Sequence, residues 1–296
     1  MQRIVPSLWF DHVAAEAAEF YTTVFSYSRV THTQHYPLDG LPDWQAEYAG
    51  QVLTVEFEIG AYRLVAINAG AEFRINPSVS FLLNFDPAVN AAAREHLNEL
   101  WGRLSEGGRE LMPLAEYPFS RHYGWLVDRY GVSWQLALSD PGAEPRPFVV
   151  PSLLFGDVAQ NRAGEAIDFY TSLFEGRTGT LAPYPEATGP ARAGSLQFGE
   201  FEVLGQWFAA MDSGVEQDFT FNPGVSLILE CADQAELDRY WEQLSAVREA
   251  EQCGWCVDRF GLSWQVVPAH LAELLAAPGA YARLLEMKKI DIAALG

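Results

Sequence analysis

The chain contains an internal repeat, and this feature restricts its possible folds more than any other. Residues 5–10, VPSLWF, return as residues 150–155, VPSLLF. Residues 124–135, GWLVDRYGVSWQ, return as residues 254–265, GWCVDRFGLSWQ, and NPSVS at 76–80 returns as NPGVS at 222–226. Two halves that share motifs in the same order encode the same structure twice.

Between the halves, residues 140–147 (DPGAEPRP) are rich in proline and glycine, which favour an exposed connection. The sequence therefore predicts two tandem domains, residues 1–140 and residues 148–296.

The hydrophobic pattern within each half predicts an α+β fold. Residues 5–10 form a buried strand pattern, and later strands are expected at 53–59, 63–68, 79–85, 125–128 and 133–138. The first helix of each half has apolar residues at helical spacing on one face, namely Ala14, Ala17, Ala18, Tyr21, Val24 and Phe25, which match Ala163, Ala166, Ile167, Tyr170, Leu173 and Phe174. The second helix of each half does the same with Leu97, Leu100, Trp101 and Leu104, which match Leu237, Tyr240, Trp241 and Leu244. This order predicts paired βαβββ modules whose second strand is poorly marked. Residues 269–295 are predicted to form one or two helices, broken at Pro278 and Gly279.

The shared motifs carry a family resemblance. Leu8-Trp9-Phe10, Cys253-Gly254-Trp255, residues 258–268 (DRFGLSWQVVP) and the tail 289–295 (KIDIAAL) resemble the PhnB-like, 3-demethylubiquinone-9 3-methyltransferase-like family of the vicinal oxygen chelate (glyoxalase/bleomycin resistance/dioxygenase) superfamily. The resemblance covers essentially the whole chain. It implies a glyoxalase-like sheet curled around a cavity, with helices outside and a ligand site inside. It also implies that a duplicated chain is similar to a fused dimer.

The charge of the chain limits its partners. Lys and Arg total 19 against 39 Asp and Glu, a formal charge of −20, which repels nucleic acid and anionic lipid. No apolar run approaches the ~20 residues that cross a bilayer. Three cysteines are too few for a disulfide framework in a chain of this length. We therefore expect a cytoplasmic protein with no nucleic-acid or membrane partner. The family resemblance implies, in addition, a small-molecule ligand and either a homodimer or a monomer that acts as a fused dimer.

The resemblance also implies where metal ligands would stand. The position of the superfamily's first-strand histidine falls at or near Pro6 and Pro151. The position of its last-strand glutamate falls at Gln135 and Gln265. Proline cannot bind a metal, and a neutral amide is a weak ligand for transition metals. The six histidines have no counterparts in the other half, and the Cys-x-x-Cys at 253–256 is predicted to be structural. The sequence therefore predicts no metal and no cofactor.

Gln135 and Gln265 are the main candidate ligand-binding residues. Strand alternation places each on the face of a neighbouring serine, with Trp134 and Trp264 pointing the other way toward a helix. A buried amide requires a hydrogen-bond partner, which is either a ligand or another strand that the amide braces. Further candidates for the ligand site, each with a structural alternative, are Ser80, Ser226, Trp125, Trp255, Asn68 and Asp212.

Two functions from different classes fit these patterns. One is binding of a small molecule in a sheet-lined cavity without a metal, and the alternative is a metal-dependent lyase, isomerase or dioxygenase that acts on a small oxygenated compound. A third hypothesis is that one or both cavities are collapsed. Methyl transfer is not predicted, because no glycine-rich loop follows a strand with the spacing that binds S-adenosylmethionine. The sequence does not identify the ligand.

Overall fold

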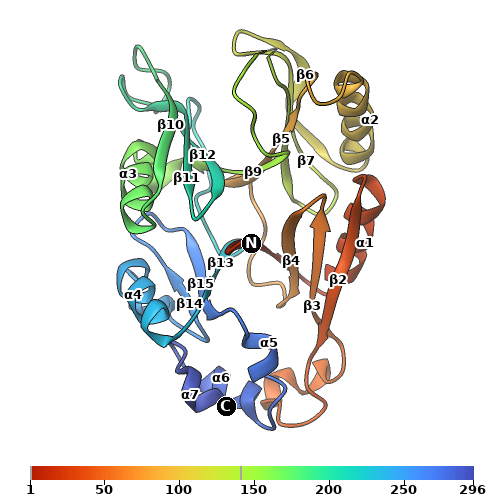
Figure 1. Ribbon diagram of the computed structural model, residues 1–296, viewed down its shortest axis with the longest axis vertical. Helices are drawn as coiled ribbons and strands as arrows, with labels where there is room; N and C mark the ends of the chain where they lie inside the picture. The colour runs from red at the N-terminus through yellow and green to blue at the C-terminus, as the bar shows by residue number, and fades with distance from the viewer. Residues whose placement is uncertain (1, 141) are drawn as a thin grey trace. The chain divides into compact units, whose positions relative to one another are not determined.

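The computed structural model describes residues 2–140 and 142–296 of the chain (Figure 1). Its strands are β1 (Ile4–Phe10), β2 (Ser28–His35), β3 (Val52–Ile59), β4 (Tyr62–Asn68), β5 (Val79–Phe85), β6 (Arg109–Tyr117), β7 (Ser120–Val127), β8 (Ser133–Leu138), β9 (Val149–Phe155), β10 (Arg177–Pro183), β11 (Leu196–Val203), β12 (Gln206–Asp212), β13 (Val225–Cys231), β14 (Trp255–Val257) and β15 (Ser263–Pro268). Its helices are α1 (Ala14–Val24), α2 (Ala93–Ser105), α3 (Ala163–Leu173), α4 (Gln234–Leu244), α5 (Leu271–Leu274), α6 (Ala280–Glu286) and α7 (Ile292–Leu295), with short 3₁₀ turns η1 (Asp43–Tyr48), η2 (Asp157–Ala159) and η3 (Arg248–Ala250).

The chain forms two compact units, and each unit takes segments from both repeats. Unit 1 contains the residues up to Thr22, Tyr27–Arg74 and Asn222–Gly296. Unit 2 contains Thr23–Ser26 and Ile75–Phe221. The division at 140–148 therefore describes the repeat in the sequence and stays a prediction for domains, since these compact units cut across it.

The two sheets share one topology. Unit 1 has the strand order β14-β15-β13-β1-β4-β3-β2, and unit 2 has β10-β11-β12-β9-β5-β8-β7-β6. In unit 1, β1 pairs antiparallel with β13 and parallel with β4, and β13 pairs parallel with β15. In unit 2, β9 pairs in the same way with β5 and β12, and β5 with β8. The antiparallel pairs β1–β13 and β9–β5 thus join strands of different repeats into single sheets.

Helices cover one face of each sheet. In unit 1, Tyr21 of α1 stacks on Phe57 of β3 with ring centroids 5.6 Å apart, and in unit 2 Tyr170 of α3 stacks on Phe201 of β11 at 5.9 Å. These four rings are at most 2% exposed, and burying such side chains stabilises the fold by about 1.5–3 kcal/mol each. The helical stripes that repeat in the sequence therefore form the interface between helices and sheet. We call the face of each sheet that is opposite to helices α1–α4 the inner face.

The closing motif of each repeat forms a polar brace on the helix-covered face. In unit 2, the Asp128 carboxylate accepts hydrogen bonds from the backbone N–H of Tyr130 and Val132 and from Trp134 Nε1, at 2.8, 3.1 and 2.8 Å. In unit 1, Asp258 accepts the corresponding bonds from Phe260, Leu262 and Trp264, at 2.8, 3.1 and 2.9 Å. Both carboxylates are at most 4% exposed. The closing motif is therefore similar in the two repeats because it forms the same hydrogen-bonded turn in both units.

Candidate functional site

A row of three serines crosses the centre of each inner face. In unit 2, Ser80 of β5 is the register partner of Ser152 on β9 and of Ser133 on β8. In unit 1, Ser226 of β13 is the partner of Ser7 on β1 and of Ser263 on β15. All six are at most 1% exposed. Each row contains residues of both repeats, so neither repeat completes it alone.

A chain of hydrogen bonds leads to the row in unit 2. Tyr123 Oη donates to Gln135 Oε1 at 2.6 Å, and Gln135 Nε2 donates to Ser80 Oγ at 2.8 Å. Ser80 Oγ donates to the carbonyl oxygen of Ser152 at 3.5 Å, while Ser152 Oγ has no hydrogen-bond partner. We call Tyr123, Gln135 and Ser80 the relay. Gln135 was predicted to lie away from the helices with a hydrogen-bond partner that the sequence did not identify. It is 2% exposed, and its side chain makes both of its hydrogen bonds to other residues of the chain.

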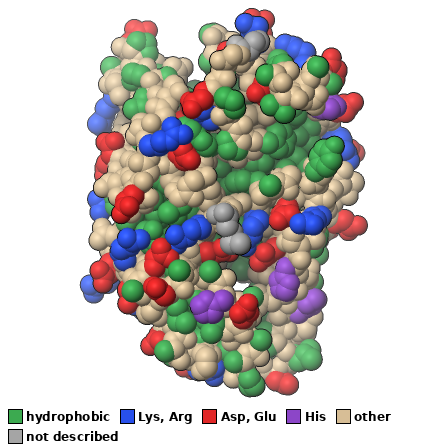
Figure 2. All heavy atoms as spheres, viewed as in Figure 1, with side chains coloured by type: hydrophobic (Ala, Val, Ile, Leu, Met, Phe, Trp, Pro, Cys, Tyr) green, Lys and Arg blue, Asp and Glu red, His purple; other side chains and the backbone are tan. Residues whose placement is uncertain are grey.

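Apolar side chains surround the relay. Figure 2 shows hydrophobic side chains gathered in a hollow of unit 2 over β5, β7 and β9. The buried members are Leu82, Tyr123, Val150 and Ala209, and the partly buried ones packed against them are Met112, Tyr117, Trp125, Ala137, Phe198 and Trp207. The surface is therefore largely aromatic, with a polar centre.

The charged groups at one end of this surface neutralise each other. Arg146 forms two 3.1 Å hydrogen bonds to the carboxylate of Glu200, and its guanidinium lies 4.0 Å from the ring centroid of Trp207. Desolvation is the largest single influence on the pKa of Arg146 and lowers it, but the hydrogen bonds that Arg146 donates to Glu200 and Glu144 and the charges of these carboxylates raise the pKa above its ordinary value. Both partners of this pair are charged, so their net contribution to this end of the face is close to zero.

The inner face of unit 1 carries the same row with different surroundings. Gln265 Nε2 donates to Ser226 Oγ at 3.0 Å, but Cys253 occupies the position that corresponds to Tyr123. Trp255 packs edge-on against Trp9, with ring centroids 5.8 Å apart. In unit 2 the corresponding Trp125 instead donates from Nε1 to Ser133 Oγ at 2.7 Å. The two tryptophans predicted for the ligand site thus make different contacts.

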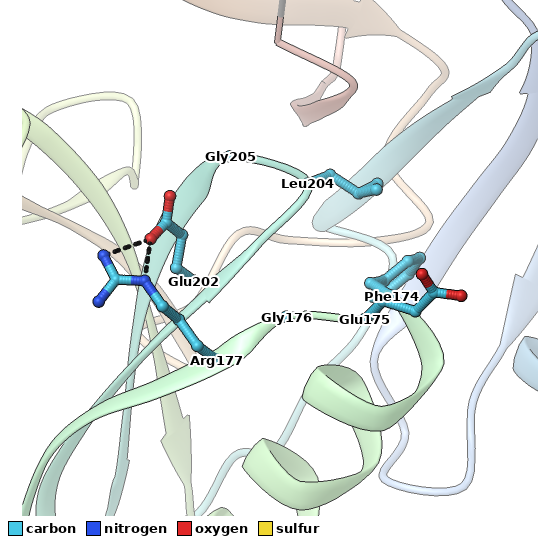
Figure 3. A pocket seen from close by; sticks show the side chains of 7 residues that line it. All are labelled: Phe174, Glu175, Gly176, Arg177, Glu202, Leu204 and Gly205. Atoms are coloured by element: carbon cyan, nitrogen blue, oxygen red, sulfur yellow. Dashed lines mark hydrogen bonds and ion pairs between the residues drawn. The ribbon is translucent and has the colours of Figure 1, made fainter.

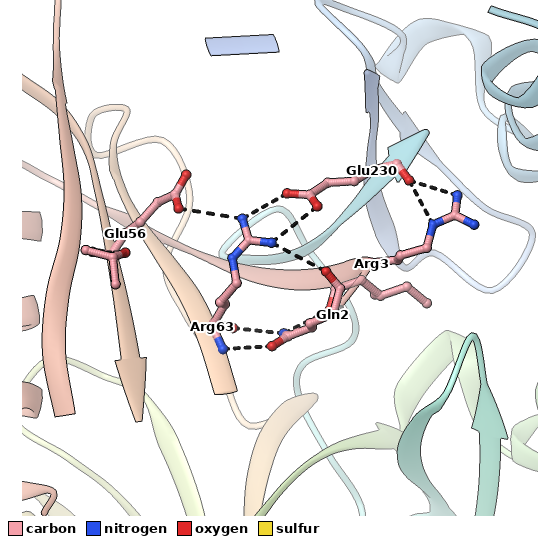
Figure 4. Close-up of polar contacts among 7 residues, drawn as sticks. Gln2, Arg3, Glu56, Arg63 and Glu230 are labelled. Atoms are coloured by element: carbon pink, nitrogen blue, oxygen red, sulfur yellow. Dashed lines mark hydrogen bonds and ion pairs between the residues drawn. The ribbon is translucent and has the colours of Figure 1, made fainter. Parts of the chain in front are cut away.

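A second difference is an ion-pair network on the inner face of unit 1 (Figure 4). Arg63 of β4 binds both carboxylate oxygens of Glu230, at 2.9 and 3.2 Å, and lies 3.6 Å from Glu56. The hydrogen bond to Glu230 is the main cause of the raised pKa of Arg63. In unit 2 the residue that corresponds to Arg63 is Trp207, so the same position is charged in one unit and aromatic in the other.

The tail of the chain covers one edge of unit 1. The backbone N–H groups of Cys253 and Gly254 donate to the carbonyl oxygens of Met287 and Lys288, both at 2.7 Å. A Cβ atom on Gly254, whose φ is +85°, would lie 2.9 Å from the side chain of Ile290, so glycine permits this contact. In unit 2, β6 pairs with β7 at the corresponding edge. The tail therefore takes the place of a strand that the second repeat lacks.

The same tail also reaches the far side of unit 1. Tyr281 of α6 donates to Gln45 Oε1 in η1 at 3.3 Å, and its ring meets that of Tyr36, which follows β2, at a centroid distance of 6.3 Å. Since β14 and β2 are the two edge strands of this sheet, the tail connects its opposite edges.

Asn68 and Asp212, two further candidates, lie on the helix-covered faces. Asn68 Oδ1 accepts from the N–H of Ala14 at the start of α1, at 2.9 Å, and Asp212 Oδ1 accepts from Ala163 at the start of α3, at 3.1 Å. Desolvation is the largest influence on Asp212 and raises its pKa, although backbone hydrogen bonds oppose the effect. Both side chains satisfy N–H groups that a helix leaves unpaired at its start, which is a structural role.

Within the described part of the chain, the histidine and cysteine side chains form no metal-ligand cluster. Across residues 2–140 and 142–296, no three His, Cys, Asp or Glu side chains are grouped to hold a metal ion. Burial raises the pKa of Cys256 and raises that of Cys253 to about 11, so both remain thiols near neutral pH. Pro6 and Pro151 lie on the helix-covered faces, and the inner-face residues beside them are Ser7 and Ser152.

A shallow pocket on the surface of unit 2 lies outside this region (Figure 3). It lies between the end of α3 and the β11–β12 turn and is lined by Phe174, Arg177, Glu202 and Gly205, among others. Arg177 is already paired with Glu202, its Nε donating at 2.7 Å. The guanidinium of Arg177 is therefore already neutralised within the pocket.

Ser7, Ser152 and Tyr123 belong to the two inner faces but were not among the residues predicted from sequence. The signal for the serines is the repeated VPS at 5–7 and 150–152, where alternation puts valine and serine on one face and proline on the other. Tyr123 has no such signal, because the second repeat has cysteine there.

Comparisons with known proteins agree with this architecture. The family model described as 3-demethylubiquinone-9 3-methyltransferase matches residues 2–137 and again residues 147–267. The chain belongs to this family. No curated protein matches the chain. A putative 3-demethylubiquinone-9 3-methyltransferase, PhnB protein, from Bacillus cereus is 31% identical over 47% of this chain and 100% of its own, with a TM-score of 0.40.

A second solved structure covers nearly the whole chain. A point mutant of glyoxalase I from Zea mays is 11% identical, covers 91% of this chain and 95% of its own, and has a TM-score of 0.52. The predicted α+β fold, with paired βαβββ modules of the vicinal oxygen chelate type in tandem, is thereby confirmed for this PhnB-like protein. Among the described residues, no helix has the length and apolarity to cross a membrane.

Proposed function

We propose that this PhnB-like protein binds one small, largely aromatic molecule on the inner face of unit 2, without a metal ion. The observation that carries the proposal is an aromatic and aliphatic surface whose polar centre contains a buried serine hydroxyl, Ser152 Oγ, with no hydrogen-bond partner. Apolar walls with a few placed polar groups are typical of small-molecule sites. A buried hydroxyl without a partner costs about 1–3 kcal/mol, which a ligand that bonds to it would recover.

Ser7 Oγ and Ser263 Oγ on the inner face of unit 1 also lack a hydrogen-bond partner, but unit 1 is the less suitable of the two faces. Its Trp9 and Trp255 rings pack on each other, Arg63 and Glu230 form a charged pair, and the tail connects its edges. We therefore place a single site in each chain rather than two.

The other candidate, a metal-dependent lyase, isomerase or dioxygenase, requires imidazole or carboxylate ligands on an inner face. The central positions there hold serine and glutamine, whose neutral oxygens do not offset the desolvation of a transition-metal ion. Methyl transfer, which the family description names, is not part of the proposal because the sequence offers no glycine-rich loop for S-adenosylmethionine.

Calorimetric titration of the intact protein with 2-naphthol tests the proposal, together with metal analysis of the purified protein. We expect binding of one molecule per chain and no stoichiometric zinc, iron or manganese. Ala137→Phe, which adds a ring beside Gln135 on the inner face of unit 2, should abolish binding, whereas Val267→Phe at the matched position of unit 1 should not. Absence of binding, or loss of binding only in the Val267→Phe protein, would refute the assignment.

A further inference from the structure

The direction of the hydrogen bonds in the relay follows from the donors and acceptors along it. The contact between Ser80 Oγ and the carbonyl oxygen of Ser152 is long, at 3.5 Å, and Ser80 is its donor because a carbonyl oxygen only accepts. Ser80 Oγ then accepts from Gln135 Nε2, which leaves Gln135 Oε1 to accept from Tyr123. The 2.6 Å separation of Tyr123 Oη and Gln135 Oε1 is typical of an O–H···O bond and shorter than N–H···O bonds usually are.

The Tyr123 oxygen consequently has lone pairs and no proton to offer. Its only hydroxyl proton is on the bond to Gln135, and burial raises the pKa of Tyr123, so the phenol stays neutral. Two neighbouring donors of the aromatic surface are also engaged, Tyr117 Oη with the carbonyl of Pro113 at 2.8 Å and Trp125 Nε1 with Ser133, whereas the Ser152 hydroxyl has no partner.

Ionic recognition has no support on this surface. Arg146 is paired with Glu200, and Arg177 with Glu202. A neutral molecule therefore matches the face better than an anion or a cation, because an ion would lose its hydration without gaining an unpaired counter-charge.

From these contacts we infer that the ligand is a neutral aromatic molecule with a hydroxyl group, and that this hydroxyl donates a hydrogen bond to Tyr123 Oη. This inference rests on the proposed function and adds the class of molecule. A site that presents a buried acceptor discriminates against an analogue whose donor is blocked, because the acceptor then loses water without gaining a partner.

The test compares 2-naphthol with 2-methoxynaphthalene, which keeps the two rings and replaces the hydroxyl by a methyl ether. We expect the wild-type protein to bind 2-naphthol about tenfold or more tightly. Tyr123→Phe should remove this preference. Tyr184→Phe is the matched control, since Tyr184 is buried in the same unit and donates to the carbonyl of Asp212 on the other face; it should keep the preference.

Gln135→Leu provides a second variant if Tyr123→Phe does not fold. It frees the Tyr123 proton, so Tyr123 could donate to the ether oxygen, and the preference for 2-naphthol should fall or reverse. Equal affinities for both compounds in the wild type, or an unchanged preference in Tyr123→Phe, would overturn the inference while the proposed function stands. If neither compound binds, the proposed function itself fails.

Discussion

The two units use one sheet topology and the same central residues, yet their inner faces differ. Both contain three buried serines and a glutamine at matching positions. In unit 2, Tyr123 is hydrogen-bonded to the glutamine and apolar side chains surround the pair. In unit 1, the ion pair of Arg63 with Glu230 and the contacts of the C-terminal tail take their place. The common part is therefore the framework of the sheet, and the differences between the repeats decide what each face does.

The difference begins with a shorter segment in the second repeat. Leu104 and Gly124 are separated by 19 residues, but their counterparts Leu244 and Gly254 are separated by only nine. The first repeat uses its extra residues for β6, which pairs with β7, and the second has only η3 before the three-residue β14. An edge strand without a partner exposes backbone hydrogen-bonding groups. The tail supplies partners for two of them in unit 1.

Deletion of residues 280–296 should cause the largest effect. Leu284, Ile290 and Leu295 are at most 7% exposed, and losing their burial costs about 1.5–3 kcal/mol each, roughly 5 kcal/mol or more in total. Hydrogen exchange followed by mass spectrometry should show much faster exchange in β14 and β15 and little change in β5 and β8. Equal acceleration in both units would contradict a role of the tail that is confined to unit 1.

Replacing the aspartate of the closing motif should have the next largest effect, and the same effect in both units. Asp128→Ala and Asp258→Ala each leave three buried or partly buried N–H donors without their acceptor, which we expect to cost about 3–4 kcal/mol. Urea unfolding monitored by tryptophan fluorescence measures this loss. If either variant lost ligand binding at unchanged stability, the motif would have a functional role in place of the structural one.

Much of this architecture could be predicted from the sequence. The helical stripes and strand alternation correctly indicated which residues face the helices, because both depend on local periodicity. Periodicity does not specify which strand pairs with which, so the joining of β1 to β13 and of β5 to β9 could not be predicted. For the same reason the sequence did not place Ser152 beside Ser80.

The position of a residue within its strand explains the placement of Asn68 and Asp212. Both end a strand and share a face with buried apolar residues such as Leu64 and Phe208, which pack toward the helices. Their location at strand ends suggested a ligand site, whereas alternation alone would have assigned them to the helix-covered face.

Replacing the glutamines should destabilise the two units by different amounts, and both losses should be smaller than those above. Gln135→Leu removes two hydrogen bonds and leaves Tyr123 Oη and Ser80 Oγ with altered partners, so we expect a loss of about 2–3 kcal/mol. Gln265→Leu removes one bond, to Ser226, and should cost about 1 kcal/mol. Chemical denaturation of both variants measures the difference. Equal costs would argue that Tyr123 contributes nothing to the relay.

The smallest expected difference between the units is in the pH dependence of their stability. It arises from Asp212 in unit 2 and its counterpart Asn68 in unit 1. Desolvation raises the pKa of Asp212 in the folded protein above its ordinary value of 3.8, so folding favours the protonated carboxyl. The resulting stabilisation is present below the unfolded pKa and is lost as the pH rises through the higher folded pKa. Asn68, its counterpart in unit 1, does not titrate.

We therefore expect the free energy of unfolding of unit 2, relative to that of an Asp212→Asn variant, to decrease as the pH rises from about 4 and to level off above the folded pKa. The amide cannot accept the Leu196 N–H bond that Asp212 Oδ2 accepts at 2.9 Å, but the amide does not titrate, so the slope of the difference reflects only the titration of Asp212. Hydrogen exchange of α3 at several pH values measures the difference. A difference that rises with pH would show that the backbone hydrogen bonds from Ala163 and Leu196 outweigh desolvation, and would make Asp212 a stabilising anion at the start of the helix.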